Sequence, residues 1–376
     1  MATNAEAEYA FTLIANSTGP FRDFGASPSP SLNAVGTVAF NASLDNGKFG
    51  VFTGNGTITT TVAQSVSSDF PLVYGSFGTP RINLTGSAVF SALPESGIAR
   101  GIYVGNGGPL LTIADTDGQF QSFASGNSTA INSAGTVAFW ARPDSGPAGI
   151  FASSGGMVTP LFLNSASLAA NADIAFNDAG TLAFRKSNAT GIVTVNSGSV
   201  TTIVDTSGPL NYFGSAPSLS SNGTVAFVAG VGGNNGGVFG IYSGNGGPLT
   251  TIADISGPFS SFGFNSFNSG QPSINDAGTV AFLASLDVGG FGIYTGDGIN
   301  TREVIGSGDS LFGSTITALQ ISPTSLNDSG QVAFFYELAN GTTGIAIANS
   351  VPEPSSSLLL ALSLGLSLAR RRARKC

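Results

Sequence analysis

The stretch SINDAGTVAF at residues 273–282 decides the fold, because six close copies of it recur along the chain. The copies are SLNAVGTVAF (31–40), RINLTGSAVF (81–90), AINSAGTVAF (130–139), AFNDAGTLAF (175–184), SLSSNGTVAF (218–227) and SLNDSGQVAF (325–334). Their glycines are separated by 50, 49, 45, 43, 55 and 52 residues and are Gly36, Gly86, Gly135, Gly180, Gly223, Gly278 and Gly330. Propeller blades run about 40–50 residues and solenoid turns are usually shorter, so this period predicts seven blades.

Each copy has the residues of a tight turn followed by a strand. Asn or Ser at the first position with Gly at the fourth is typical of a type I turn. Asn33, Asn83, Asn132, Asn177, Asn275 and Asn327 hold the first position, and Ser220 holds it in the fifth copy. In the TVAF strand, Val and Phe point to one face and Thr and Ala to the other. Both faces are small or apolar, which predicts a strand between neighbouring blades with Phe packed over Ala.

A second repeated unit supplies the outer half of each blade. It reads GVFTGNG (50–56), GIYVGNGG (101–108), GIFASSGG (149–156), GIYSGNGG (240–247) and GIYTGDG (292–298). Asn-Gly or Asp-Gly between short apolar runs is a strong signal for a β-hairpin. Partner strands such as PLLTIADT, SVTTIVDT and PLTTIADI follow. One repeat is therefore predicted to form four short antiparallel strands.

The two ends of the chain complement each other. The seventh copy has QVAFFYEL and GIAIAN but no TIAD-like strand after them, and YAFTLIANSTGPF (9–21) resembles such a strand without the rest of its blade. An N-terminal strand that completes the last blade would close the ring and leave no free sheet edge. We therefore predict an all-β, seven-bladed propeller over residues 1–349. An open or stacked array of the same hairpins is the alternative.

The pattern PSxNxxGxVAF…GIYxGNGG…LTxIAD resembles the TolB-like propeller blade. It resembles more closely bacterial surface proteins with tandem NxxGxxAF repeats and varied C-terminal anchors. The resemblance covers about residues 9–349. Because no agreed biochemical activity belongs to that class, the likeness implies a fold and a location.

The last 26 residues, VPEPSSSLLLALSLGLSLARRRARKC, differ from the repeats. Val351, Pro352, Glu353 and Pro354 precede an apolar stretch and a basic cluster that includes Arg370, Arg371 and Arg372. This order resembles the PEP-CTERM sorting signal, so residues 350–376 are expected to form an apolar helical tail that anchors transiently in the inner membrane. The resemblance implies export to the cell envelope or the extracellular space and processing by an exosortase. The apolar stretch of 15 residues is shorter than the about 20 of a usual membrane span, so an interfacial tail is the alternative.

The N-terminal sequence MATNAEAEYAF has neither a basic segment nor an apolar segment of a signal peptide. Export would need such a segment, so we expect that the start of this sequence is truncated.

Composition argues against several classes of function. Histidine is absent and Cys376 is the only cysteine, which removes the commonest general base and the thiolate metal sites. Five of 13 basic residues lie in the tail, so the rest of the chain has 8 basic and 21 acidic residues, a net charge of -13. Such a surface is not expected to bind nucleic acid. We predict no catalytic residues and no cofactor.

Three acidic residues occupy one repeat position. Asp115, Asp205 and Asp254 match each other and match Asn16 near the N-terminus. One interpretation is a ring of oxygen ligands on one propeller face, for Ca²⁺ or for sugar hydroxyls. The other, which we favour, is Asx turns that close the outer strands.

These observations lead to one main hypothesis and two alternatives. The main hypothesis is a non-enzymatic, structural or adhesive exported protein, associated with exopolysaccharide, because neutral hydroxyl and amide side chains suit a hydrated polysaccharide matrix. The first alternative is a propeller that binds a glycan or another ligand. A polysaccharide hydrolase or lyase is less expected, because neither a histidine nor a carboxylate pair marks an active site.

Overall fold

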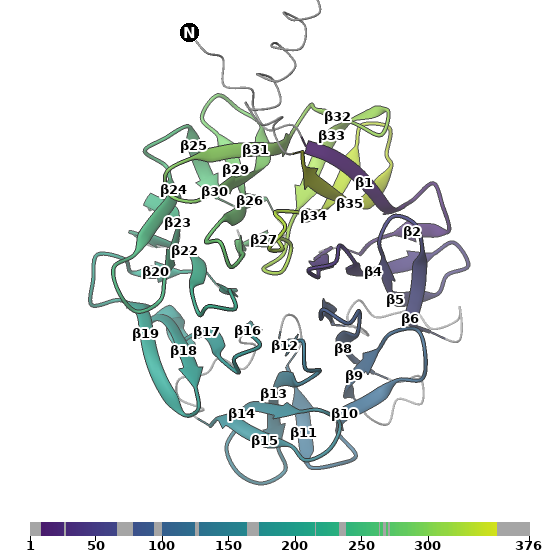
Figure 1. The fold of residues 1–376 in the computed structure, drawn as a ribbon, viewed down its shortest axis with the longest axis vertical. Coiled ribbons are helices and arrows are strands. Elements are labelled where there is room, and N and C mark those ends of the chain that lie inside the picture. The colour runs from purple at the N-terminus through teal and green to yellow at the C-terminus, as the bar shows by residue number, and fades with distance from the viewer. Residues whose placement is uncertain are drawn as a thin grey trace, which may run out of the picture.

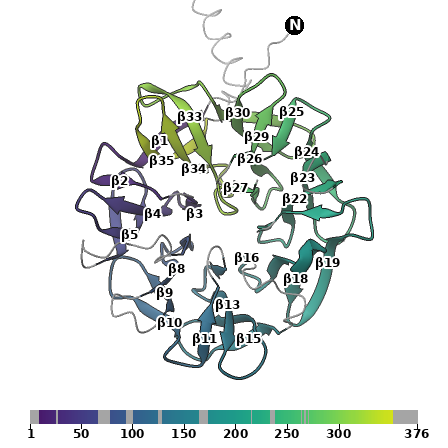
Figure 2. The same ribbon diagram turned by 180° about the vertical axis from the view of Figure 1, so that it is seen from behind.

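Seven antiparallel sheets stand in a ring around a central axis in the computed structural model, and Figures 1 and 2 show this ring from its two sides. The structure describes residues 9–25, 28–65, 78–93, 100–124, 128–163, 173–214, 216–232, 238–262, 264–265, 268–269 and 271–351. The ring confirms the predicted seven-bladed propeller of antiparallel strands. The predicted tail helix lies outside the described residues.

The strands of the first four blades follow the order of the sequence. Blade 1 contains β2 (Phe21–Asp23), β3 (Ser31–Leu32), β4 (Val38–Leu44), β5 (Phe49–Gly54) and β6 (Thr59–Gln64). Blade 2 contains β7 (Arg81–Ile82), β8 (Ala88–Ala92), β9 (Gly101–Gly105) and β10 (Leu111–Asp115). Blade 3 contains β11 (Phe120–Phe123), β12 (Thr129–Ile131), β13 (Val137–Pro143), β14 (Gly149–Ser153) and β15 (Thr159–Phe162). Blade 4 contains β16 (Ile174–Phe176), β17 (Leu182–Arg185), the 3₁₀ turn η1 (Ser187–Ala189), β18 (Gly191–Asn196) and β19 (Ser199–Asp205).

The last three blades complete the ring. Blade 5 contains β20 (Tyr212–Phe213), β21 (Ser218–Leu219), β22 (Val225–Val231), β23 (Val238–Gly244) and β24 (Thr250–Asp254). Blade 6 contains β25 (Phe259–Phe262), β28 (Ser273–Ile274), β29 (Val280–Leu286), β30 (Phe291–Gly296) and β31 (Thr301–Gly306), with a small hairpin of β26 (Phe264–Asn265) and β27 (Asn268–Ser269). Blade 7 contains β32 (Ser310–Leu311), β33 (Ser314–Gln320), β34 (Val332–Leu338), β35 (Thr343–Ser350) and the N-terminal β1 (Tyr9–Asn16).

The inner strand of several blades is longer than the sequence indicated. In blade 1 it is split into β2 and β3, which pair with opposite ends of β4. Blades 3, 5 and 6 repeat this arrangement with β11 and β12, β20 and β21, and β25 and β28. The PSL-type segment is therefore only the second half of this strand. The first half comes from segments such as PFRDF (20–24) and PFSSF (258–262).

The N-terminal strand closes the ring as predicted. β1 pairs antiparallel with β35 from Tyr9 opposite Ser350 to Asn16 opposite Gly344, and Figure 1 shows the first and last strands side by side. Ile14 and Ala15 are each 6% exposed and pack with Phe335 of blade 7. The last blade is thus built from both ends of the chain, and the closure joins residues more than 300 positions apart.

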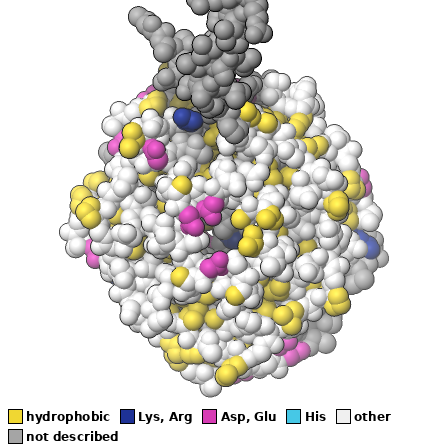
Figure 3. All heavy atoms as spheres, viewed as in Figure 1, with side chains coloured by type: hydrophobic (Ala, Val, Ile, Leu, Met, Phe, Trp, Pro, Cys, Tyr) yellow, Lys and Arg dark blue, Asp and Glu magenta, His cyan; other side chains and the backbone are white. Residues whose placement is uncertain are grey.

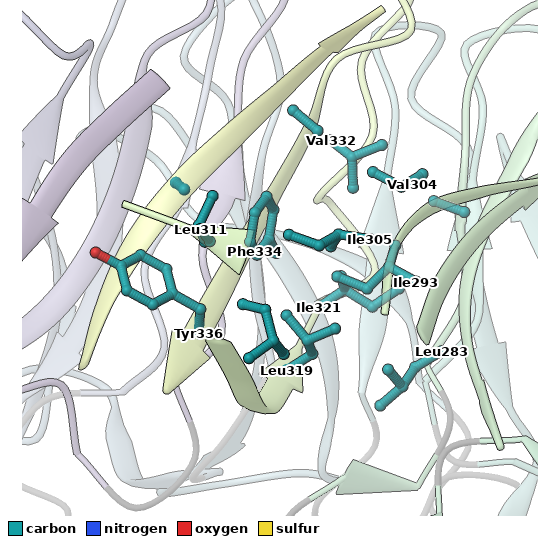
Figure 4. Close-up of a cluster of buried hydrophobic side chains, with 14 of the residues drawn as sticks. Leu283, Ile293, Val304, Ile305, Leu311, Leu319, Ile321, Val332, Phe334 and Tyr336 are labelled. Atoms are coloured by element: carbon teal, nitrogen blue, oxygen red, sulfur yellow. The ribbon is translucent and has the colours of Figure 1, made fainter. Parts of the chain in front are cut away.

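Buried side chains between successive blades form the core. Phe282 of blade 6 packs in one cluster with Ala226 of blade 5, and Phe334 of blade 7 packs with Ala281 of blade 6. The same pairing of Phe over the preceding blade's Ala recurs at the other junctions, with Val89 in place of Ala in blade 2. Figure 4 shows one such junction, where Ile293 and Ile305 of blade 6 face the aliphatic side chains of blade 7. The core is therefore a ring of interfaces and not a single central cluster.

Glycines at the outer hairpins allow each blade to touch its neighbour closely. Gly298 has a φ of +88°, and a Cβ there would lie 2.7 Å from Thr250 Cγ2 of the preceding blade. Gly278 has a similar φ of +81°, but a Cβ there would meet nothing within 4 Å. An alanine at Gly278 would therefore carry only the cost of the left-handed backbone, whereas an alanine at Gly298 would also carry the cost of the contact with the preceding blade.

We expect Gly298→Ala to destabilise the protein by about 2–4 kcal/mol and Gly278→Ala by about 1–2 kcal/mol. Both variants carry the cost of a left-handed Ala, about 1–2 kcal/mol, and only Gly298→Ala adds the overlap with Thr250, typically about 1–3 kcal/mol. Urea unfolding of both variants measures the difference. Equal losses of stability would show that the hairpin does not pack tightly on the preceding blade.

Candidate functional site

The inner turn of every blade is held by its first side chain. In blade 1, Gly36 N–H donates to Asn33 O at 3.2 Å, and Asn33 Oδ1 accepts from Thr37 N–H at 2.8 Å. Gly36 has a φ of +80°, which is why the fourth position is glycine. Asn33 is only 4% exposed, so its side-chain amide needs hydrogen-bond partners inside the protein.

The amide nitrogens of these asparagines bridge neighbouring blades. Asn33 Nδ2 donates to Asn83 O at 3.0 Å, and Asn83 Nδ2 donates to Asn132 O at 3.2 Å. The same bridge joins Asn177 to Ser220 O, Asn275 to Asn327 O and, across the closure, Asn327 to Asn33 O. The asparagine side chain thus has two structural roles. Its Oδ1 atom stabilises the turn, and its Nδ2 atom links neighbouring blades.

Aspartates bridge the two remaining junctions. Between blades 3 and 4, Ser133 N–H donates to Asp178 Oδ1 at 2.6 Å. Between blades 5 and 6, Ser221 N–H donates to Asp276 Oδ1 at 2.6 Å, and Asn222 Nδ2 donates to Asp276 O at 3.0 Å. All seven junctions are therefore bridged, and the inner turns form one hydrogen-bonded ring, which we call the axial ring.

The axial ring surrounds a cavity of about 320 Å³ on the propeller axis. Three consecutive residues of each inner turn line the cavity. The last of the three follows the Asn or Ser and directly precedes the exposed tip of the turn. These seven residues are Ala34, Leu84, Ser133, Asp178, Ser221, Asp276 and Asp328. The volume falls at the low end of small-molecule pockets, which span roughly 300–1,000 Å³.

The mouth of the cavity is chemically asymmetric. Asp178, Asp276 and Asp328 are exposed and belong to blades 4, 6 and 7, whereas Ala34 and Leu84 give blades 1 and 2 an apolar side. Figure 3 shows acidic side chains beside the central opening and apolar side chains across from them, with basic side-chain atoms inside. The mouth thus offers carboxylate oxygens and an apolar surface to a small ligand.

Buried serine hydroxyls also link neighbouring blades close to the axial ring. Ser218 Oγ donates to Pro323 O at 2.7 Å, and Ser273 Oγ donates to the same oxygen at 3.2 Å. Ser322 Oγ donates to Pro30 O at 2.6 Å. These bonds join blades 5, 6, 7 and 1 near the axis.

In blade 2, a buried arginine occupies the repeat position that serine holds in blades 5 and 6. Arg81 corresponds to Ser218 and Ser273, is 4% exposed, and directly precedes Ile82 and Asn83 of the cavity wall. Its Nη1 atom is buried and has no hydrogen-bond partner among the described residues. Burial lowers the pKa of Arg81 to about 10, which the charge of Asp173 opposes. Arg81 therefore remains a cation at neutral pH.

The structure does not bring Asp115, Asp205 and Asp254 together. They end β10, β19 and β24, the outer strands of three different blades. Each accepts a backbone hydrogen bond from the residue two positions later, as Asn16 does, which is the geometry of an Asx turn. The Ser207 hydroxyl and N–H hold the pKa of Asp205 below its ordinary value. No group of three potential metal-ligating side chains occurs in the described part of the chain.

Of the residues assigned to the sorting signal, Val351 alone is described, and its side chain is exposed. Pro352, Glu353, Pro354, Arg370, Arg371 and Arg372 lie outside the described residues. None of the described segments is a helix with the length and apolar character needed to cross a membrane.

The axial ring also gives a testable result. We expect Asn327→Asp to destabilise the protein by about 2–3 kcal/mol, because the carboxylate keeps the acceptor for Gln331 N–H but loses the donor to Asn33 O. Asn327→Ser also loses this donor but adds no buried charge opposite Asn33 O, and Ser220 shows that Oγ can hold the turn by accepting from Thr224 N–H, so it should cost less, about 1 kcal/mol. Chemical denaturation measures both, and equal stability of Asn327→Asp and the wild type would contradict the bridging role of this amide.

Comparison with known proteins finds family matches over most of the chain. A model of a family of unknown function (DUF7453) matches residues 12–311 and 314–358, and a model of the PEP-CTERM protein-sorting motif matches residues 350–375. The second match confirms the predicted sorting signal. The protein is thus exported, targeted to the cell envelope and a substrate for exosortase processing. No curated protein sequence matches the chain.

Solved structures show the same fold at low sequence identity. A prolyl endopeptidase is 11% identical with a TM-score of 0.50, and the alignment covers 89% of this chain and 52% of that enzyme, so the chain spans about half of its length. An oligogalacturonate lyase in complex with manganese is 8% identical with a TM-score of 0.50, over 92% of this chain and 99% of that chain. At these identities the likeness shows the propeller fold alone.

Proposed function

The chain belongs to the family of unknown function DUF7453 and ends in a PEP-CTERM sorting motif, and on this premise we propose that it is a non-enzymatic structural or adhesive protein of the cell envelope or extracellular matrix. The observation that supports the proposal most is the double closure of the ring. β1 seals the sheet edge of blade 7, and the axial ring ties all seven inner turns together. A scaffold closed in both ways resists the local opening by which proteins outside the cell are degraded.

The surface chemistry supports exopolysaccharide as the partner. Charged residues make up 9% of the chain, and the ion pair Arg22–Asp23 is exposed to solvent. The exposed turns present Asn, Ser and Thr instead, for example Asn55, Asn222 and Asn340. Neutral hydroxyl and amide groups exchange hydrogen bonds with water for hydrogen bonds with sugar hydroxyls at little electrostatic cost.

A genetic experiment in the native host tests this function. Loss of the protein should reduce the amount of matrix polymer that stays on the cells after shear, and the full chain should restore it. Ile14→Asp, which places a charge in the β1 closure, should fail to restore retention, whereas Val288→Ala, at a side chain 92% exposed, should restore it.

Two results would contradict the structural or adhesive function. One is unchanged polymer retention in the deletion strain. The other is release of soluble sugar from purified envelope polymer by the purified full chain, which would identify a hydrolase or lyase.

Glycan binding at the axial cavity is the second candidate function. It is favoured by the cavity of about 320 Å³ whose mouth combines three exposed carboxylates with the apolar Ala34 and Leu84. Sugar rings have hydroxyl edges and apolar C–H faces, and such a mouth offers a partner for each. In this form of the proposal, adhesion is carried by the propeller axis and not by the surface in general.

A further inference from the structure

The chain leaves the propeller on the face that carries the mouth of the axial cavity, which we call the mouth face. β34 runs away from the inner turn of blade 7 and β35 returns to it, because the two strands pair antiparallel. Gln331 Nε2 donates to Asn349 Oδ1 at 2.7 Å, which holds the end of β35 beside this turn. Ser350 ends β35, and the exposed Val351 follows it as part of the sorting signal. The tail therefore begins on the mouth face.

The outer hairpins of the blades lie on the same face. Consecutive turns of an antiparallel sheet alternate between its two ends, so the inner turn and the outer hairpin of one blade share an end. In blade 3, Thr136 Oγ1 and Ser154 Oγ form a hydrogen bond of 3.2 Å between the two. In blade 4, Asn196 Nδ2 donates to Ala179 O at 3.1 Å. The mouth face thus consists of the inner turns and the outer hairpins around them.

Exposed apolar side chains are concentrated on the mouth face. Among the described residues, the large hydrophobic side chains with the greatest exposure are Val35, Ile58, Met157, Val288 and Ile299. Val35 lies in the inner turn of blade 1, and the outer hairpins of blades 1, 3 and 6 carry Ile58, Met157 and Ile299. Val288, between β29 and β30, lies on the opposite face. Scattered apolar side chains need no explanation, but these four share the face from which the tail leaves.

The length of the linker decides which face can meet a membrane in which the tail is anchored. Residues 351–354 separate the end of β35 from the apolar stretch that begins at Ser355, and these four residues span at most about 14 Å. To bring the opposite face to the bilayer, the linker would have to run the length of β35, whose 8 residues extend about 26 Å. The anchored propeller therefore meets the bilayer with its mouth face or with the edge of blade 7.

The exposed side chains favour contact through the mouth face. An edge-on contact would leave Met157 in water, because blade 3 lies across the ring from blade 7 (Figure 1). The apolar stretch of 15 residues is a weak anchor by itself, and apolar side chains that insert at the lipid interface add to the binding. The rim carboxylates Asp178, Asp276 and Asp328 would be repelled by anionic lipid. A neutral lipid surface is therefore the partner that fits.

We propose that the mouth face is a membrane-contact surface, which lies on a neutral lipid bilayer while the tail is anchored. Val35, Ile58, Met157 and Ile299 are then at the lipid interface. Use of this surface depends on the anchoring of the tail before exosortase processing, and it adds a second partner to the proposed structural or adhesive function. The mouth of the axial cavity faces lipid in the anchored protein and becomes accessible to polymer when the tail is removed.

Site-specific fluorescence of the full chain on phosphatidylcholine vesicles tests this contact. In a Cys376→Ser background, Met157→Cys and Val288→Cys each carry one environment-sensitive dye, at side chains that are 83% and 92% exposed. The emission of the dye at 157 should shift to shorter wavelength and be quenched by spin-labelled lipid, whereas the dye at 288 should keep its emission in water. Ile299→Cys is a second position on the mouth face if the Met157→Cys chain does not fold. A chain that ends at Pro354 lacks the apolar stretch and gives the emission of each dye on the unbound propeller.

A binding measurement gives the size of the effect. Met157→Ser should weaken binding of the full chain to the same vesicles by about tenfold, as expected for the loss of one apolar side chain from the lipid interface. Val288→Ser is the matched control and should bind as the wild type does. Sedimentation of the protein with the vesicles measures both.

Each contrary outcome has a distinct meaning. Equal responses of the dyes at 157 and 288 would overturn the contact through the mouth face. Vesicle-bound protein with no response at 157 or 299 would show that the edge of blade 7 meets the bilayer instead. Failure of the full chain to bind vesicles would overturn the contact as well, because the tail would then not act as an anchor. None of these results involves polymer, so matrix retention in the native host tests the structural or adhesive function separately.

Discussion

A chain that lacks residues 1–16 is expected to lose its cooperative folding. β1 contributes seven paired positions to β35, and its side chains Ile14 and Ala15 are buried between blades 7 and 1. Burial of each large aliphatic side chain stabilises by about 1.5–3 kcal/mol, and each backbone hydrogen bond adds about 1 kcal/mol net. The expected loss of more than about 5 kcal/mol is comparable with the whole stability of many domains.

Circular dichroism on heating and gel filtration measure this loss. The truncated chain should aggregate or melt over a broad range, because β35 then has an unpaired edge. A chain that begins at Tyr9 keeps β1 and is the matched control. If the chain without β1 melted as sharply and at the same temperature as this control, the N-terminal strand would not be the closure of the ring.

Replacement of one interblade phenylalanine is the second large effect. Phe282 has no exposed surface, lies over Ala226 of blade 5, and contacts Phe259 and Tyr294 with ring centroids 5.7 and 6.0 Å apart. Phe282→Ala should therefore lower the free energy of unfolding by about 3–5 kcal/mol. Urea unfolding monitored by fluorescence of Trp140 measures it.

The control for this variant is Val288→Ala, at a side chain 92% exposed, which should change stability by less than about 0.5 kcal/mol. A loss below about 1 kcal/mol for Phe282→Ala would mean that the junctions between blades do not carry the core. Because Phe282 packs on Ala226 of the preceding blade as well as on the aromatic rings of its own blade, this result would also weaken the physical reason for a closed ring.

The architecture could be predicted from the sequence because the repeat specifies both the number of blades and the burial of their strands. The spacing of Gly36, Gly86 and their equivalents gives the number of blades, and the alternation of TVAF gives two buried faces. Closure by β1 follows from two incomplete ends that fit one blade. The split inner strand was missed, because the short segment at Phe21–Asp23 carries no period of its own and forms a strand only by pairing with β4.

The candidate site was less visible in the sequence. Asn33 and its equivalents are typical of turns, but their Nδ2 bonds to the next blade depend on the ring geometry, which local spacing does not contain. The cavity mouth is formed by a position of the inner turn that changes from Ala34 and Leu84 to Asp276 and Asp328. That variation within a constant repeat was a usable signal. The aligned Asp115, Asp205 and Asp254 drew attention instead, although they lie on three separate outer strands.

The termini of the mature protein in the cell-envelope fraction of its native host provide the most direct test of the central claim, that the tail is a sorting signal and the propeller is the part that works outside. Mass spectrometry of that fraction should find a chain that ends near Val351-Pro352-Glu353-Pro354, without the arginine cluster of residues 370–372. An intact arginine-rich tail on a protein that stays in the cytoplasm would contradict the account.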